Sequence, residues 1–363
     1  MAELVIKSDK IIKNVEKLNH FLLKHKVQWS LIVKVLSGHR EFLKKLLFHP
    51  VVKQLHSVGD SRISGLRVIK EINPNIVTMY VKPPAMDTIK SIVSYADISM
   101  NSSFRTIEAL NNEAARQGKQ HRVIIMIELG ELREGILREK LVDFYKRVFE
   151  LENIRIEGIG TNLGCMYGVQ PTYDKLLQMS LYKQLIEAKF DTELPLISGG
   201  SSITLPLVGK SAMPKNINHL RIGETAFLGT SPFDNKKFRD LSVDAFEYLG
   251  NIIELEIKET YPDGILTDGN IGLTAESEQM EYDHSYRAIL DFGILDVDVN
   301  ELTPKDTNIR FAGTTSDMSV YDLGPIQKDK NCKYKVGDRV IFTPSYMAVA
   351  RLMNSKFIDK KIV

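Results

Sequence analysis

The chain has 363 residues, 43% of them hydrophobic, which is longer than one ordinary domain and supplies enough apolar material for a large core. Its formal net charge of +2 gives no bulk attraction to nucleic acid or to a membrane surface, and its apolar runs are strand-sized, well short of a membrane span. Two cysteines, Cys165 and Cys332, are too few for a disulfide framework or a structural zinc site. Charged residues stand in the N-terminal segment where a signal peptide needs an apolar centre, so we expect a reduced, cytoplasmic, enzyme-like protein.

Strand-like and helix-like segments alternate along the chain from residue 28 onward, and the longest helix-like stretch is YDKLLQMSLYKQLIEAKF at 173–190. Pro84, Ser102 or Ser103, and Pro171 stand where the helix-like segments begin, as prolines and capping residues do. Eight strand candidates within about 200 residues predict a (β/α)8 TIM-type barrel, because a doubly wound open sheet rarely needs eight units in a row. The predicted strands cover residues 29–35, 56–60, 75–81, 96–100, 121–129, 154–161, 194–200 and 219–228.

The character of the sequence changes after residue 235. Turn signals such as YPDG and KVGD separate short strand-like runs at 248–257, 287–295, 308–316 and 338–345. We therefore expect two domains, a (β/α)8 barrel at 1–235 that carries the binding site and a smaller C-terminal β domain at 236–363.

A lysine interrupts the apolar run LIVKVLSGH at residues 31–39. Burying a lysine is costly unless its charge is paired, neutralised or used chemically, although an edge strand whose lysine reaches solvent would read the same. Active sites of these barrels lie at the C-terminal ends of the strands, and Lys34 stands one residue from such an end. Polar residues recur at the same end of later strands: Ser57 to Asp60 with Arg62, Asn101, Glu128 with Arg133, Thr161 and Asn162, Ser198 to Ser202, and Arg221 to Glu224.

The last two predicted strands carry a candidate phosphate site. SGGSS at 198–202 follows the seventh strand, and RIGE at 221–224 lies in the eighth. Glycines allow a backbone to approach an anion closely, and serine hydroxyls donate to it, although SGGSS alone is more often a plain turn. A lysine at the first strand together with a phosphate site at the last two suits pyridoxal 5′-phosphate (PLP), which a lysine holds as a Schiff base and a phosphate site anchors.

Several motifs taken together resemble a known family. They are VKV around Lys34, VGDSRI at 58–63, ADISMNS at 96–102, ELGELREG at 128–135, GIGTNLGC at 158–165, ISGGSS at 197–202, LRIGE at 220–224, TSDMSVYDL at 315–323, and the segment VGDRVIFTPSY that ends at Tyr346. Over essentially its whole length the chain resembles the fold type III PLP-dependent alanine racemase family, and within it the ornithine racemase branch. The resemblance implies a (β/α)8 barrel followed by a smaller β domain.

The resemblance also implies roles for individual residues. Lys34 would hold PLP and move the Cα proton on one face of the substrate. Arg133 would donate to the phenolic oxygen of PLP, Arg221 would face its pyridine nitrogen, and Asn162 stands beside the ring where alanine racemases have a histidine. Because arginine does not give up its proton, the ring nitrogen would stay largely unprotonated and the cofactor would be a weaker electron sink. The implied phosphate ligands are Ser201, Ser202, Gly223, Glu224 and Tyr346.

The chain departs from the alanine racemase pattern at three places. Ile294 stands where those enzymes carry a second-base tyrosine, and Met126 stands where many carry a carbamylated lysine. The phosphate-binding tyrosine that those enzymes carry soon after the lysine is also missing, since LSGH follows Lys34 and Val35. A racemase needs acid–base groups on both faces of Cα. Candidates for the second group are Cys165, His284, Asp296, Asp298 and Asp317, of which we take Cys165 and Asp317 as catalytic candidates. The alternative for Cys165 is a small buried hydrophobe, and for His284 an exposed loop residue.

Aspartates of the second domain are also candidates for substrate recognition. A distal ammonium group, as in ornithine or lysine, needs a counter-charge in its binding site. We expect it from Asp291, Asp296, Asp298 and Asp317, with turn or strand-edge positions as the alternative for each.

The sequence thus predicts a PLP-dependent amino-acid racemase, an isomerase that interconverts L and D forms, with ornithine favoured, lysine second, and no metal. The resemblance implies a head-to-tail homodimer with shared active sites. The alternatives are an alanine or broad-specificity racemase, a fold type III decarboxylase, a D-threonine aldolase, and a non-enzymatic PLP-binding homeostasis protein. Decarboxylases of this type are longer and bring a catalytic cysteine that Cys332 matches poorly. The aldolase needs a late His/Cys metal motif, and the absence of any histidine after His284 argues against it. The homeostasis proteins lack a β domain, whereas this chain is predicted to have one.

Overall fold

The computed structural model describes residues 1–267, 272–275, 282–326 and 332–363. They form two compact units, one of Ile11–Val243 and one of Met1–Lys10 together with Asp244–Val363. The expected barrel domain began at residue 1, whereas the first strand, β1 (Glu3–Ile6), belongs to the second unit. It pairs antiparallel with β10 (Phe246–Glu259) and parallel with β17 (Asp359–Ile362), so backbone hydrogen bonding overrides its place in the sequence.

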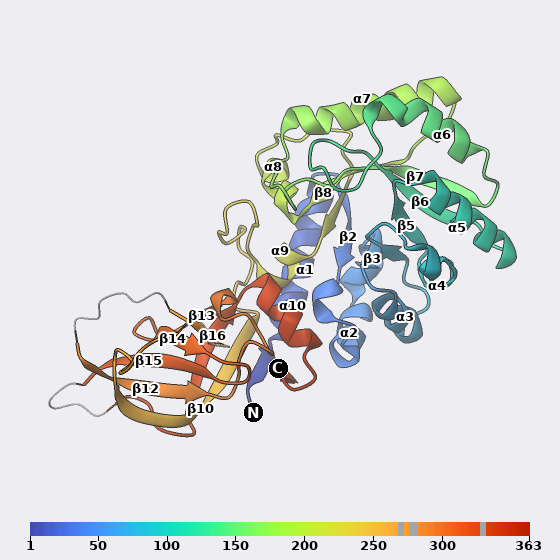
Figure 1. The fold of residues 1–363 in the computed structure, drawn as a ribbon. Coiled ribbons are helices and arrows are strands. Elements are labelled where there is room, and N and C mark those ends of the chain that lie inside the picture. Colours follow the sequence, from blue (N-terminus) through green and yellow to red (C-terminus); the bar gives the residue numbers. More distant parts are fainter. Residues whose placement is uncertain (268–271, 276–281, 327–331) are drawn as a thin grey trace. The chain divides into compact units, whose positions relative to one another are not determined.

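The larger unit is a closed barrel of eight parallel strands surrounded by helices, as predicted (Figure 1). Each strand pairs with the next one along the chain, and β9 closes the barrel against β2. The strands are β2 (Gln28–Ile32), β3 (Ser57–Asp60), β4 (Thr78–Tyr80), β5 (Ile98–Asn101), β6 (His121–Met126), β7 (Ile154–Gly160), β8 (Leu196–Ser201) and β9 (His219–Ile222).

Helices follow the strands around the outside of the barrel. The longest of them, α7 (Tyr173–Phe190), has the predicted limits. It begins where the Thr172 side chain accepts the backbone N–H of Lys175, at 3.3 Å, and ends at Asp191 in the left-handed conformation. The others are α1 (Ser8–Lys24), α2 (Arg40–Leu47), α3 (Ile63–Ile72), α4 (Ile89–Tyr95), α5 (Phe104–Arg116), α6 (Leu141–Phe149), α8 (Leu205–Gly209) and α9 (Glu224–Leu228).

The barrel strands are buried on both faces, which explains their continuous apolar runs. One core cluster joins four strands through Met79, Ile98, Met100, Ile124, Met126 and Leu196. Met126 is fully buried in it. The position that the resemblance gives to a carbamylated lysine is therefore an apolar core position in this protein.

All eight predicted barrel strands are longer than the observed ones, and two of the predicted ranges run into a helical element. The first was expected to reach residue 35, but β2 ends at Ile32 and a 3₁₀ helix (Lys34–Leu36) follows. The last was expected to reach residue 228, but β9 ends at Ile222 and α9 follows Gly223. The strand-like residues of α9 are buried there, and the backbone N–H of Thr225 donates to the Ser202 hydroxyl at 3.3 Å, so tertiary contacts decide the conformation.

The second unit is built on a sheet in the order β11-β14-β15-β12-β10-β1-β17, with β16 pairing with β10 and β13. Its strand pairs are antiparallel except for β1 and β17. This confirms the expected β domain. Buried rings of Tyr248, Phe292, Tyr321 and Phe342 pack edge-on or tilted in its core. Its further elements are β11 (Leu273–Thr274), β12 (His284–Leu290), β13 (Leu302–Pro304), β14 (Arg310–Thr314), β15 (Ser319–Pro325), β16 (Arg339–Pro344) and α10 (Tyr346–Asn354).

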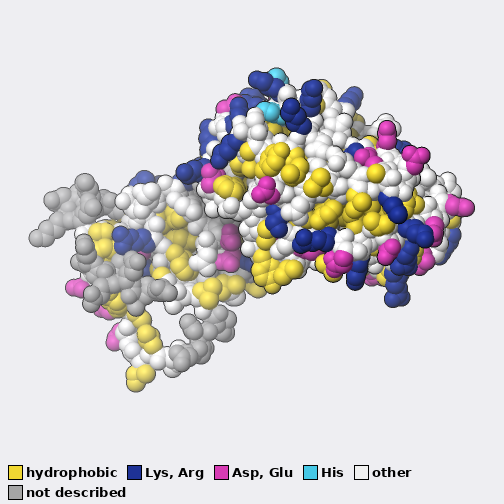
Figure 2. All heavy atoms as spheres, turned by 90° about the horizontal axis from the view of Figure 1, so that it is seen from above, with side chains coloured by type: hydrophobic (Ala, Val, Ile, Leu, Met, Phe, Trp, Pro, Cys, Tyr) yellow, Lys and Arg dark blue, Asp and Glu magenta, His cyan; other side chains and the backbone are white. Residues whose placement is uncertain are grey.

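The surface matches the balanced composition. On the face drawn in Figure 2, Lys and Arg side chains of the larger unit are interspersed with Asp and Glu side chains and with apolar patches. Among the described residues, the helices are all too short or too polar to span a bilayer.

Candidate active site

Lys34 leaves the barrel wall instead of lying in it. The backbone N–H of Val33 donates to the Gly59 carbonyl at 2.8 Å, and the chain then turns into the 3₁₀ helix (Lys34–Leu36), which Ser37 ends in the left-handed conformation. Val35 and Leu36 are fully buried, whereas Lys34 is exposed. The turn therefore presents an amine at the C-terminal end of β2 without burying its charge, which explains a lysine in an apolar run.

Two carboxylates respond to the charge of Lys34. Asp60, at the end of β3, is 1% exposed, and this burial raises its pKa to about 6 despite the opposing effects of the Arg62 N–H bond and the Lys34 charge. Its side chain fits because Gly65 has no Cβ, which would lie 2.3 Å from a carboxylate oxygen. Burial also raises the pKa of Glu224, again against the charge of Lys34. The amine therefore stands in a partly anionic setting.

Arg221 is a buried cation on β9, 5% exposed. Its guanidinium donates to the Ser198 hydroxyl, to the Thr161 carbonyl at 2.8 Å and, at the limiting distance of 3.5 Å, to Asn162 Oδ1. All of these acceptors are uncharged. Burial lowers its pKa to about 10, so Arg221 still carries its charge at neutral pH.

His219 extends this network through the barrel interior. One ring nitrogen lies 2.9 Å from the Ser198 hydroxyl and the other lies 2.8 Å from the Ser30 hydroxyl, which in turn bonds Ser57 at 2.7 Å. His219 is fully buried, and this burial holds its pKa well below the ordinary value. The ring is therefore neutral, and it fixes the hydroxyl that receives Arg221.

Two acidic side chains organise the loops that follow β6 and β7. Glu128 accepts the backbone N–H groups of Gly130, Leu132 and Arg133. Glu131, 1% exposed, reaches into the next loop and accepts five N–H groups, at 2.8–3.2 Å, from Gly164, Cys165, Tyr167, Gly168 and Val169. Burial opposes its ionisation, but these bonds outweigh burial and lower its pKa. The loop that carries Asn162 and Cys165 is thus tied to the loop that carries Arg133.

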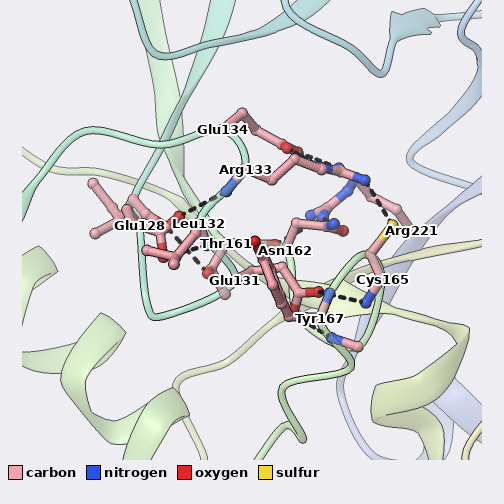
Figure 3. Close-up of polar contacts among 12 residues, drawn as sticks. Glu128, Glu131, Leu132, Arg133, Glu134, Thr161, Asn162, Cys165, Tyr167 and Arg221 are labelled. Atoms are coloured by element: carbon pink, nitrogen blue, oxygen red, sulfur yellow. Dashed lines mark hydrogen bonds and ion pairs between the residues drawn. The ribbon is translucent and has the colours of Figure 1, made fainter.

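Arg133 is clamped between two groups (Figure 3). It donates from Nε and Nη2 to both carboxylate oxygens of Glu134, while Nη1 lies 2.7 Å from Cys165 Sγ. The same figure places Thr161, Asn162 and Arg221 beside this cluster. The C-terminal end of the barrel therefore gathers six of the predicted site residues, namely Lys34, Arg133, Asn162, Cys165, Arg221 and Glu224.

The predicted phosphate ligands of the barrel follow β8 and β9. Ser201 ends β8, Ser202 is buried and starts a short 3₁₀ helix, and Gly223 with Glu224 opens α9. Ser201 pairs with Arg221 in the register of the two strands. The two segments are therefore neighbours, as a shared anion site requires.

The remaining predicted residues lie in the β unit. Tyr346 opens α10 after the capping residue Ser345, and Asp317 is exposed in a turn. The turn at 293–297 packs on that turn, because the N–H groups of Ile294 and Leu295 donate to the carbonyls of Thr315 and Ser316. Asp296 and Asp317 are thus brought onto neighbouring turns.

The other acidic candidates of the β unit have local partners. Asp298 accepts the Asn300 N–H at 3.1 Å and lies 3.6 Å from Arg351, and Asp291 holds the backbone and side chain of Asn251 at 2.8 and 2.7 Å. His284 is exposed at the start of β12.

Sequence reasoning missed Glu131, Glu134 and His219. Nothing in their spacing distinguishes them from ordinary surface or core residues. The positive φ angles of Leu132 (49°) and Gly135 (139°) bend the loop that aims Glu131 and Glu134, and only Gly135 is visible as a signal in the sequence.

Comparison with known proteins identifies the family of the chain. Residues 6–232 match the model of the alanine racemase N-terminal domain. The chain is 36% identical to an ornithine racemase of Acetoanaerobium sticklandii, over 87% of this chain and 89% of that one, and 28% identical to a lysine racemase of Thermotoga maritima, over 98% and 97%. Its fold matches the crystal structure of alanine racemase from Bartonella henselae with covalently bound pyridoxal phosphate, with a TM-score of 0.70 and 15% identity, over 100% of this chain and 99% of that one. A barrel with an exposed lysine at its first strand, followed by a β unit, and these similarities together place the chain in the alanine racemase family, as an amino-acid racemase.

Proposed function

We propose that this racemase uses PLP and acts on basic amino acids, with ornithine first and lysine second. One observation carries the cofactor assignment: an exposed amine, Lys34, and a buried cation, Arg221, occur at the same end of the barrel. Among the described residues, Arg221 bonds only uncharged acceptors. A planar, anionic ligand with a basic ring nitrogen complements both groups.

A second feature of the barrel fits the same ligand. Asn162 Nδ2 is buried and has no hydrogen-bond partner among the described residues. Buried donors are rarely left unsatisfied, so this amide is suited to an acceptor atom supplied by a ligand. Lys34, Arg133, Asn162 and Arg221 would hold the ring, and Ser201, Ser202 and the backbone of Gly223 and Glu224 would hold the phosphate. The β unit's Tyr346 is an additional candidate.

When bound, PLP supplies an electron sink that makes the Cα–H bond of an attached amino acid acidic. The chain's own groups determine where that proton goes. Lys34 Nζ is the group suited to take it and return it on one face of Cα. Arg221, being charged at neutral pH, would donate to the ring nitrogen and would not release its own proton.

The opposite face needs its own acid, for which Cys165 and Asp317 remain the candidates. The geometry of the barrel supports Cys165, because its Sγ is exposed and is oriented by Arg133. Asp317 is exposed, and its Oδ1 accepts the Ser316 hydroxyl at 3.0 Å.

The substrate proposal rests on the two relatives named as ornithine and lysine racemases and on the acidic turns of the β unit. Asp291 and Asp298 each lie within 4 Å of a cationic group of this chain, the N-terminal amine at 3.8 Å and Arg351 at 3.6 Å. Asp296 and Asp317 accept bonds only from uncharged groups among the described residues, so they are the groups best suited to a distal ammonium. Norvaline resembles ornithine but lacks that ammonium. We expect D317N to lose activity on ornithine and to keep its activity on norvaline; equal losses on both would reject this role.

The cofactor and reaction are tested together. Purified protein is treated with PLP and borohydride, the labelled peptide is identified by mass spectrometry, and Cα deuterium exchange is followed with ornithine, lysine and alanine. We expect labelling at Lys34 and fastest exchange with ornithine. K34A should lose both, whereas K44A, which changes an exposed lysine of α2, should lose neither. Labelling without exchange for any amino acid would favour a PLP carrier, and no labelling would reject the cofactor.

The second acid is identified by the symmetry of exchange. If Cys165 serves one face, C165S stops racemisation, but one enantiomer still exchanges its Cα proton through Lys34. The same result in D317N would assign the role to Asp317.

We propose in addition a head-to-tail homodimer, for which light scattering of the purified protein is the direct test.

A further inference from the structure

Glu134 and Arg133 are adjacent in sequence, yet their side chains meet in a two-point ion pair. Adjacent residues of a helix or strand point in different directions. Here Leu132 (φ 49°) and Gly135 (φ 139°) bracket the pair with backbone conformations that break this alternation. A Cβ on Gly135 would lie 2.4 Å from the Glu128 nitrogen, so the bend also depends on glycine. The loop is thus shaped to bring the two side chains together.

The ion pair is shielded on its acidic side. The Glu134 side chain is 7% exposed and that of Arg133 is 38% exposed. Burial opposes the ionisation of Glu134, but the bonds and charge of Arg133, with a contribution from Arg221, lower its pKa. The charge of Glu134 in turn opposes the lowering of the pKa of Arg221 that burial causes. One carboxylate therefore bonds the Arg133 guanidinium and interacts electrostatically with that of Arg221.

The backbone of the loop has other supports. Glu128 accepts three of its N–H groups, and Glu131 ties it to the loop after β7. The Glu134 carboxylate bonds the Arg133 side chain and its own backbone N–H. Its removal should release that side chain while the loop backbone stays in place.

We propose that Glu134 is a positioning residue that holds the Arg133 guanidinium in one orientation, with Nη1 toward Cys165 and the end of the barrel, and balances the charge of the Arg133–Arg221 pair. The role rests on the proposed function, since Arg133 is a cofactor ligand there. Two donors of Arg133 are occupied by Glu134, so Nη1 and the outer edge of the guanidinium remain for Cys165 and for an anionic ligand oxygen.

The experiment separates the ion pair from the cofactor. The full chain, stripped of cofactor, is treated with phenylglyoxal, and modification of Arg133 is followed by peptide mass spectrometry. In E134Q, which keeps the shape but loses the charge, we expect Arg133 to react about tenfold faster than in wild type, because a charge-assisted two-point bond is lost. E134D keeps the charge but reaches less far, and we expect an intermediate rate. E139Q, at an exposed glutamate of the same segment, removes the same charge and should leave the rate unchanged.

PLP affinity is measured on the same proteins by equilibrium titration. We expect weaker binding in E134Q than in E139Q, with unchanged thermal unfolding of the cofactor-free chains. A wild-type rate of Arg133 modification in both E134Q and E134D would overturn the proposal, whatever the protein binds. If E134Q speeds the modification of Arg133 but the wild-type protein binds no PLP, the proposed function is rejected and the role of Glu134 in holding Arg133 is kept. If E134Q fails to fold, a wild-type rate in folded E134D with unchanged affinity also overturns it.

Discussion

Replacing Glu131 by glutamine should release the loop after β7 from the loop after β6. The carboxylate accepts three N–H groups on Oε1 and two on Oε2, the latter from Gly164 and Val169. A glutamine amide keeps only one acceptor oxygen. If that oxygen takes the place of Oε1 and keeps its three bonds, the NH2 group takes the place of Oε2, so the two bonds of Oε2 are lost and donors face donors there. At about 1.5 kcal/mol per bond to a charged acceptor, the loop loses about 3 kcal/mol of local stability.

Amide hydrogen exchange measures this loss directly. A local change of about 3 kcal/mol corresponds to exchange about 100-fold faster at the amides of residues 164–169. The pKa of Glu131 is lowered in the folded protein, so its contribution is present above the ordinary glutamate pKa and is lost as the pH falls through the folded value. The difference between E131Q and wild type should therefore be constant near neutral pH and shrink in acid. E139Q is the matched control.

An exchange rate within twofold of wild type at these amides would refute the reasoning, because it would mean that water replaces the carboxylate at no cost. A large difference that persists unchanged in acid would also refute it, since the interaction depends on the ionised form. Weaker PLP binding should accompany the loosened loop, because Asn162 and Cys165 lie on it.

Three further outcomes follow from buried or bent positions. G135A should lower the free energy of unfolding by about 2–4 kcal/mol, because residue 135 has a φ of 139° and the added Cβ would contact the Glu128 backbone. G118A, at a φ of 63° with open space around it, should lower that free energy by only about 1 kcal/mol. Similar losses for the two variants in urea denaturation would contradict this difference. D60N should be more stable than wild type at pH 8 by up to about 3 kcal/mol and equal at pH 3, because a folded pKa of about 6 means that ionisation costs stability as the pH rises. A D60N protein less stable at pH 8 would show that the carboxylate is needed ionised. His219 is neutral when folded, so wild-type stability should fall below pH 6.5, and H219Q should flatten that slope by up to about 1.4 kcal/mol per pH unit; an unchanged slope would exclude the buried ring as its source.

The barrel could be predicted from the sequence because each of its strands is a short apolar run buried on both faces and followed by a helix. That pattern is local and repeats eight times. The limits of α7 are likewise local, since Pro171 stands just before its start and its helix-like residues continue without a break to its end. Lys34 could be singled out because a charge in a buried run is a conflict that the sequence itself displays.

The local pattern failed where long-range contacts decide. The segment Glu224–Leu228 has strand-like residues, but it folds as a helix against Ser202. β1 stands before the barrel in the sequence, but its hydrogen-bond partners come from residues more than 200 positions away. No periodicity within a short window contains that information.

By itself, the sequence determined the alternation of elements, the segments around Lys34 and at 198–202 that mark the barrel end, and the family resemblance they carry. Only the tertiary structure decided how the charges are used. It placed Glu131 under five N–H groups of another loop, turned Glu134 onto Arg133, and left Arg221 buried among uncharged acceptors. The physical reason is that hydrogen bonding and desolvation depend on distances between segments remote in the chain, whereas the patterns readable in a sequence report only the neighbours of each residue.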